Sequence, residues 1–272
     1  MMERLARMNA GYPGLSTEDD NAMFDHPRIF FLFSLLVLWL SAQAGAWFRR
    51  LRPLKEEERD DFGVVEAATL TLLGLIIGFS FSMATSRYDL RKNYEEAEAN
   101  AIGTEYVRAG LVPAANGAEV RALLRKYLDL RILFYEARDG QELQKINADT
   151  AQVQAQLWSA VQNPAVAQPS YVIALAVSGM NDVLNSQGYT QAAWWNRIPT
   201  AAWSLMIVIA ICCNLLIGYG ARSTGARSTL LFILPLVVSI SFQLIADIDS
   251  PRGGFIHVSP QNLESLAASL QK

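Results

Sequence analysis

Side chains that carry most enzyme chemistry are scarce in this chain of 272 residues. The two cysteines, Cys212 and Cys213, are adjacent within an apolar run, and neighbouring cysteines rarely form a disulfide. The two histidines, His26 and His257, are far apart, and neither belongs to a pattern with the spacing of metal ligands. The sequence also shows no Gly-rich phosphate loop and no nucleophile–base pair. We therefore expect no catalytic residues, no metal site and no cofactor, and the sequence does not predict an enzyme.

Positive charge is also limited, with 23 Lys and Arg residues against 26 Asp and Glu residues and a net charge of −3. Without a basic cluster, these numbers predict no nucleic-acid partner. Apolar residues make up 51% of the chain and charged residues 18%. This mixture is too apolar for an ordinary soluble domain and too charged for a protein that lies wholly within a membrane. We therefore expect an integral membrane protein with a large part outside the lipid bilayer.

Four apolar stretches are each long enough to cross the hydrocarbon core of a bilayer, which takes about 20 residues. They are residues 29–48, 62–85, 198–221 and 228–246. The only charged residue among them is Glu66, in the first turns of the second stretch. The sequence therefore predicts four transmembrane helices.

Short connections predict that these helices form two hairpins, with both connections on one face of the membrane. The chain then divides into an N-terminal flank (1–28), a first hairpin (29–85), an extramembrane domain (86–197), a second hairpin (198–246) and a polar tail (247–272). Basic residues flank the two membrane faces almost equally, so charge leaves the orientation open.

The segment 86–197 has helical periodicity and almost no strand signal. Apolar residues recur at three- and four-residue steps over 120–131 and 143–158, as on the buried face of amphipathic helices. Asn163 and Pro164 are predicted to end the second of these helices, and a further helix is expected over 170–185. The second membrane stretch runs into this segment without a break, so one helix is expected to pass from lipid into water. The predicted fold class is all-α, with a helical bundle inserted between the second and third transmembrane helices.

The second membrane helix carries two stripes at helical spacing. Small or polar residues form the first: Ala67, Thr71, Gly74, Gly78, Ser82 and Thr85. This stripe allows two interpretations: it makes close contact with another helix, or it forms one wall of a water-filled pore. The second stripe is apolar and consists of Leu72, Ile76, Phe79 and Met83. It is either exposed to lipid or forms a hydrophobic constriction that gates by dewetting. We take Thr71, Gly74, Ile76, Gly78, Phe79, Ser82 and Met83 as candidate pore-lining or gate residues.

Polar residues also follow one another along the fourth membrane helix. Ser239, Gln243 and Asp247 lie at four-residue steps after Pro235. Such groups face the bundle or a wet cavity, because lipid offers no hydrogen-bond partner. Arg87, at the end of the second membrane stretch, is expected at the same depth as Asp247 and Asp249. We therefore predict that Arg87 pairs with one of these two acids, with a solvated helix end as the alternative.

Four acidic residues follow on the same long helix: Glu95, Glu96, Glu98 and Glu105. Basic residues interleave with them, a pattern typical of a solvated helix face. The alternative is a cation site built from Glu96 and Glu105.

Three stretches resemble a known family: GLIIGFSFSMATSRYDLRKNYEEAEANAIGTEYVRAGLVP, LLRKYLDLRI and the tail DIDSPRGGFIHVSP. Over roughly 63–260 the chain resembles the bacterial membrane proteins that contain a bestrophin-like domain, a family of uncharacterised function. The resemblance implies four transmembrane helices with a helical domain between the second and third. True bestrophins are pentameric anion channels whose helical domain is cytoplasmic and whose second helix lines the pore.

The resemblance therefore implies a homo-oligomer, a pentamer by analogy, in the bacterial inner membrane, with small inorganic ions as the passing solute. Two features depart from the bestrophin pattern. The neck residues of bestrophins lie at four-residue steps, whereas here only a mixed ladder of Ile76, Phe79 and Met83 provides bulky apolar groups. The acidic calcium site of animal bestrophins has no counterpart beyond Asp247 and Asp249. Two functions stay open: an anion channel lined by the second helix, or a non-conducting scaffold or signalling protein whose helical domain docks a partner.

Overall fold

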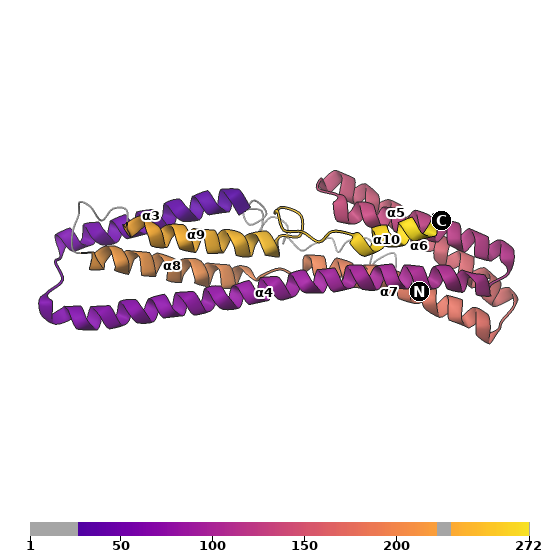
Figure 1. The fold of residues 1–272 in the computed structure, drawn as a ribbon, viewed down its shortest axis with the longest axis horizontal. Coiled ribbons are helices and arrows are strands. Elements are labelled where there is room, and N and C mark those ends of the chain that lie inside the picture. Colours follow the sequence, from indigo (N-terminus) through magenta and orange to yellow (C-terminus); the bar gives the residue numbers. More distant parts are fainter. Residues whose placement is uncertain (1–26, 222–229, 272) are drawn as a thin grey trace. The chain divides into compact units, whose positions relative to one another are not determined.

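The computed structural model describes residues 27–221 and 230–271, and every regular element within them is helical (Figure 1). In chain order these are α3 (Pro27–Leu51), the short 3-10 helix η1 (Glu56–Glu58), α4 (Arg59–Arg108), the 3-10 helix η2 (Ala109–Leu111), α5 (Ala114–Glu136), α6 (Gly140–Ala167), α7 (Tyr171–Trp195), α8 (Thr200–Gly220), α9 (Leu230–Asp249) and α10 (Gln261–Leu270). The predicted all-α class is confirmed.

The described residues form two compact units. The membrane unit comprises residues 27–87, 197–221 and 230–257, and the helical unit comprises residues 88–196 and 258–271. Four helices within the described residues are long and apolar enough to cross a membrane, which confirms the four predicted spans. The predicted connection 222–227 and residues 1–26 of the predicted N-terminal flank lie outside the described residues. The arrangement in two hairpins therefore stays a prediction.

Helix α4 is a single helix of 50 residues, as the unbroken sequence predicted. Asp60 and Asp61 lie in its first turn, where carboxylates favour the positive end of the helix dipole. The 3-10 turn η2 follows its last residue, and Pro113 then precedes α5. Helix α4 therefore ends at Arg108, just before this turn.

Within the membrane unit, α3 and α8 run in the same direction and meet at their main chains. A Cβ atom on Gly45 would overlap the carbonyl oxygen of Leu215, and one on Gly218 would overlap that of Ala42. Small residues at such crossings let membrane helices approach closely, which maximises dispersion contacts where the hydrophobic effect is weak. The Arg49 guanidinium of α3 donates to the carbonyl oxygens of Tyr219 (3.0 Å) and Gly220 (2.7 Å), which lack partners at the end of α8.

Three aromatic rings join α3, α8 and α9 at the other end of the same helices. Phe30 meets Trp203 edge to face at a centroid distance of 5.3 Å, and Phe242 lies 6.3 Å from each of them. All three rings are buried. Because Phe30 and Trp203 lie near the start of their helices and Phe242 lies near the end of α9, α9 runs opposite to α3 and α8.

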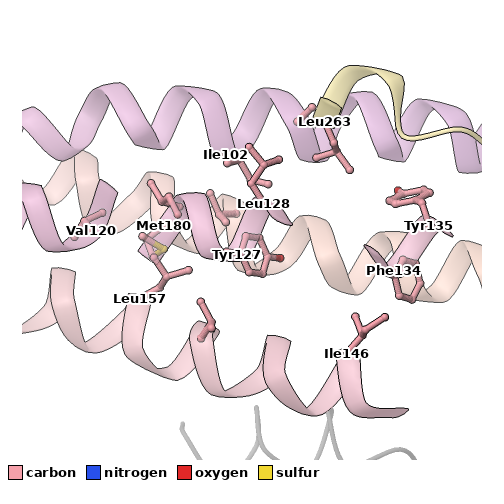
Figure 2. Packing of buried hydrophobic residues seen from close by; sticks show 14 of the residues in the cluster. Ile102, Val120, Tyr127, Leu128, Phe134, Tyr135, Ile146, Leu157, Met180 and Leu263 are labelled. Atoms are coloured by element: carbon pink, nitrogen blue, oxygen red, sulfur yellow. The ribbon is translucent and has the colours of Figure 1, made fainter. Parts of the chain in front are cut away.

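The main hydrophobic core of the helical unit is built from the apolar faces that the sequence predicted (Figure 2). Its largest buried residues come from all five helices of the unit: Ile102 of α4, Tyr127, Leu128, Phe134 and Tyr135 of α5, Leu157 of α6, Met180 and Trp194 of α7, and Leu263 of α10. Because no helix of the unit covers its own apolar face, the unit is stable only as a bundle.

Two helices of this unit extend beyond their predicted ends. Helix α6 continues past Pro164 to Ala167, although proline has no N–H to donate to the carbonyl oxygen four residues earlier. Helix α7 continues past Gly188 to Trp195 instead of ending near residue 185. Tertiary contacts stabilise this extension: Tyr189 stacks on Tyr94 at 5.9 Å, and Trp194 meets Phe134 at 5.1 Å.

Candidate functional site

The membrane half of α4 is the least covered of the four membrane-spanning segments. Of its most apolar 18 residues, 6% are buried, against 28% for α3 and 50% for α9. Its buried positions, Leu73, Ser80 and Ala84, follow one another at helical spacing and form one face. Given about 100° of rotation per residue, this face lies roughly 140° from the stripe of small and polar residues and roughly 90° from the apolar stripe.

The stripe of small and polar residues does not face its own chain. Thr71, Gly74, Gly78 and Ser82 are all exposed. A Cβ atom on Gly74 or Gly78 would meet no atom of the described residues within 4 Å. The Thr71 hydroxyl donates to the Ala67 carbonyl oxygen (2.8 Å), so its proton is satisfied within the helix. The described part of the chain therefore supplies no close helix contact along this stripe.

The apolar stripe is also largely uncovered. Phe79 is 63% exposed and Met83 is 40% exposed, while Ile76 is partly buried. Within the described residues the covered face of α4 is a third one, and both stripes remain open. The two stripes lie roughly 130° apart around the helix, so each is open to lipid, to another copy of the chain or to a cavity.

Asp249 at the end of α9 holds the start of α8. Both of its carboxylate oxygens accept from the backbone N–H of Ile198 at 3.1 Å, and the Arg197 Nε lies 3.8 Å from one of them. The carboxylate is buried, and burial of a charge is costly unless hydrogen bonds and an opposite charge satisfy it.

Asp247 organises the turn that follows α9. Its carboxylate accepts from the backbone N–H of Phe255 (2.8 Å) and of Ile256 (3.0 Å). Gly254 lies against this carboxylate so closely that a Cβ atom would come within 2.5 Å of it. The Asp-x-Asp-x-Pro-x-x-Gly tail is thus a folded turn around a buried carboxylate. The predicted pairing of Arg87 with Asp247 or Asp249 stays a prediction.

The polar residues that the sequence analysis singled out along α9 face into the membrane unit. Ser239 is fully buried, and Gln243 is partly buried. The Ser239 hydroxyl has no hydrogen-bond partner among the described residues, and the same holds for the side-chain oxygen of Asn214 in α8. These groups face protein rather than lipid.

The acidic residues of the distal half of α4 do not form a solvated face. Glu95, Glu98 and Glu105 are buried, and only Glu96 is exposed. The predicted solvated face is therefore wrong for three of the four residues. Because Glu96 and Glu105 differ in this way, they do not form the alternative cation site either. Among the described residues, no group of three or more His, Cys, Asp and Glu side chains is placed to hold a metal ion.

Glu95 caps the C-terminal helix α10, which the sequence analysis missed. Its carboxylate accepts from the backbone N–H groups of Asn262 (2.9 Å) and Leu263 (3.0 Å) and from the Asn262 side chain (2.6 Å). Pro260 at the N-cap provides no side-chain oxygen, so Glu95 takes over that role from another helix. Residues 258–271 thereby belong to the helical unit.

Glu98 is the centre of a buried polar network. Its carboxylate accepts from Arg131 Nε (2.5 Å) and from the hydroxyl of Thr190 (3.2 Å), and the Tyr135 hydroxyl lies 3.5 Å away. Burial, together with the negative charge of Glu98, raises the pKa of Tyr135 above its usual range, so this hydroxyl stays protonated. The sequence carried one signal for this network, since Arg131 continues an otherwise apolar helix face.

Comparisons with known proteins agree with this geometry. The model of the bestrophin-like domain matches residues 29–263, which is most of the chain. The chain belongs to the bestrophin-like family. The four membrane helices and the helical unit described above are therefore the bestrophin-like domain of this protein.

Solved structures show the same fold. A crystal structure of a bacterial bestrophin homologue from Klebsiella pneumoniae, carrying a point mutation, has a TM-score of 0.61 and 12% identity, covering 89% of this chain and 96% of that one. A second variant of a Klebsiella pneumoniae homologue has a TM-score of 0.61 and 13% identity, covering 90% of this chain and 99% of that one. No curated protein sequence matches the chain. At these identities the likeness shows the fold alone.

Proposed function

We propose that this bestrophin-like protein is an oligomeric membrane channel that passes small anions, with α4 lining the pore. The observation that carries the proposal is that both the small-polar and the apolar stripe of α4 remain open within the protomer. Family membership and the shared fold with bacterial bestrophin homologues support it. In a ring of identical subunits, one open face of α4 would line the central pore, and the other would contact the adjacent copy.

The chemistry of the two stripes assigns them different roles in such a ring. Ile76, Phe79 and Met83 are bulky and apolar, and a ring of these side chains forms a constriction that gates by dewetting. The stripe of Thr71, Gly74, Gly78 and Ser82 lets the backbone of a neighbouring helix approach closely. We therefore place the apolar stripe at the pore axis and the small-polar stripe against the next copy.

Anion flux from proteoliposomes tests conduction directly. Vesicles that contain the purified protein and are loaded with chloride are diluted into chloride-free buffer, and efflux is followed with a chloride-selective electrode. Efflux well above that of protein-free vesicles supports the channel, and replacement of chloride by gluconate gives its selectivity for small anions. Efflux equal to that of empty vesicles, from protein shown to be oligomeric, would contradict the proposal.

One observation favours the alternative, a non-conducting scaffold whose helical unit docks a partner. Apolar side chains are exposed where α6 ends and α7 begins: Val166 is 72% exposed, Tyr171 97% and Val172 50%. Neighbouring exposed apolar groups are typical of interaction surfaces. The scaffold predicts no efflux in the same vesicle assay, and it predicts that Tyr171→Ser abolishes capture of the partner.

By the same family membership, we propose a pentamer in the bacterial inner membrane with the helical unit in the cytoplasm. A cysteine at an exposed position of the helical unit tests the orientation, for example Gln156→Cys in a protein without Cys212 and Cys213. A membrane-impermeant maleimide added to spheroplasts labels this cysteine only if the helical unit faces outward. Labelling of intact spheroplasts would contradict the cytoplasmic placement.

A further inference from the structure

Glu105 is a buried acid whose carboxyl group has no hydrogen-bond partner in the described part of the chain. Its side chain is 0% exposed. Neither carboxyl oxygen has a hydrogen bond to any described residue. An ionised carboxylate in such a place loses several kcal/mol of hydration without compensation, whereas a neutral carboxylic acid loses much less. The environment therefore favours the protonated form.

The site is formed where α4 contacts α7, and Gly179 of α7 makes room for it. A Cβ atom on Gly179 would overlap a carboxyl oxygen of Glu105 and come within 2.6 Å of an Arg108 guanidinium nitrogen. Both side chains of α4 thus lie across the Gly179 backbone. A glycine in the middle of a helix is less favourable than alanine, and the close approach of Glu105 explains its presence here.

The charged groups around the site act in opposite directions. Arg108 lies one turn further along α4 and favours the ionised acid, while Asp182, one turn after Gly179 on α7, disfavours it. On the neighbouring α5, the Arg121 guanidinium donates to the Tyr106 carbonyl oxygen at 3.2 Å. Burial has the largest effect on the pKa of Glu105. Together, burial and the charge of Asp182 outweigh the opposite effect of Arg108 and raise this pKa to about 8.

We propose that the Glu105 carboxyl is a proton-binding site that links the contact between α4 and α7 to pH. With its proton bound, the acid is neutral and the two helices stay in contact across Gly179. When the proton leaves, an uncompensated charge is left between them, and the contact weakens so that water or Arg108 can reach the carboxylate. This inference does not depend on conduction, because it concerns only the helical unit.

The stability of the folded protein should fall with rising pH, because the folded chain binds the Glu105 proton more tightly than the unfolded chain does. The unfolded chain releases the Glu105 proton near the ordinary pKa of a glutamic acid, about 4.5, whereas the folded chain keeps the proton until about pH 8. Between these values the folded state binds more protons, so the stability contributed by protonated Glu105 is full below about pH 4.5 and is lost as pH rises to about 8. Above that pH both states are ionised, and this contribution no longer changes.

Thermal unfolding of the full-length protein in detergent between about pH 5 and pH 9 tests the proposal, with Glu105→Gln as the variant. Glutamine keeps the shape of the neutral acid and cannot ionise. We expect the apparent Tm of the wild type to fall relative to that of Glu105→Gln by about 5 °C or more over this range. Glu96→Gln, an exposed neighbour on the same helix, should follow the wild type. Parallel curves for wild type and Glu105→Gln would overturn the proposal.

Infrared difference spectra give a second readout that does not need the variant to be stable. The wild type should lose the C=O band of one protonated carboxyl with a midpoint near pH 8. Asp182→Asn should shift this midpoint to lower pH, and Arg108→Gln should shift it to higher pH, as the signs of the two charges require. The absence of a band that titrates above pH 6, or a midpoint that neither substitution moves, would contradict the assignment.

Discussion

Gly218 of α8 lies directly against the main chain of Ala42 in α3, where a Cβ atom would overlap the Ala42 carbonyl oxygen. We expect Gly218→Ala to separate the two helices and to destabilise the protein by about 1–3 kcal/mol, the usual cost of overfilling a tight contact. Thermal unfolding followed by tryptophan fluorescence measures this loss. Gly63→Ala on α4 is the control, because an added Cβ there meets no atom within 4 Å and alanine favours the helix. Equal melting temperatures for both variants would show that α3 and α8 are not in contact at this point.

Gly179 and Gly188, on the same helix α7, should respond to alanine in opposite ways. Gly179→Ala drives a methyl group into the Glu105 carboxyl, whereas a Cβ on Gly188 has open space around it. We expect Gly179→Ala to lower the melting temperature and Gly188→Ala to leave it unchanged or raise it. Glu105→Ala should make Gly179→Ala tolerable, because it removes the overlapping group. The absence of such a rescue in the double variant would count against the contact.

In the buried pair Glu98–Arg131, removing one charge alone should destabilise the protein more than removing both charges. Arg131→Met leaves the Glu98 carboxylate buried without its cation, and we expect a loss of about 3–5 kcal/mol. The double variant Arg131→Met with Glu98→Gln should recover part of that loss, because no unpaired charge then remains. Urea unfolding monitored by circular dichroism gives these values, with exposed Lys126→Met as the control. A double variant that is less stable than Arg131→Met alone would argue against this account.

We propose that Arg87, where the membrane half of α4 ends, pairs with Asp247 or Asp249. A double-mutant cycle of Arg87→Gln with Asp249→Asn, and a second with Asp247→Asn, measures the coupling. One of the two cycles should give a coupling energy of about 0.5–3 kcal/mol, while the other should be additive. Additivity in both cycles would favour a solvated Arg87.

The sequence predicted the four membrane helices and the long α4 because both signals are local. A run of about 20 apolar residues is sufficient to identify a span. Between residues 59 and 108 no proline interrupts the helical pattern, which favours one continuous helix. Helix ends depended on tertiary contacts instead: α7 continues past Gly188 because Tyr189 and Trp194 find partners on other helices.

The burial of Glu95, Glu98 and Glu105 was missed for a related reason. Acids interleaved with bases at helical spacing have the same pattern whether they face water or partners on other helices. Whether such an acid is buried depends on its partners, which lie far away in the sequence: Asn262 for Glu95 and Arg131 for Glu98. The face of α4 that the described residues cover, with Leu73, Ser80 and Ala84, was also missed, because it has no distinctive composition.

Single-channel recording in planar lipid bilayers, on the wild type and three α4 variants, tests the central claim most directly. The wild type should carry an anion current. Phe79→Ala, which shortens a side chain of the proposed constriction, should raise the conductance or the open probability. Gly78→Leu should reduce assembly, seen as a smaller oligomer by size-exclusion chromatography with light scattering. Phe81→Ala is the matched control, since this phenylalanine is exposed on the same helix but belongs to neither stripe. A correctly assembled wild type without current, or a Phe79→Ala current identical to that of the wild type and of Phe81→Ala, would contradict a pore lined by α4.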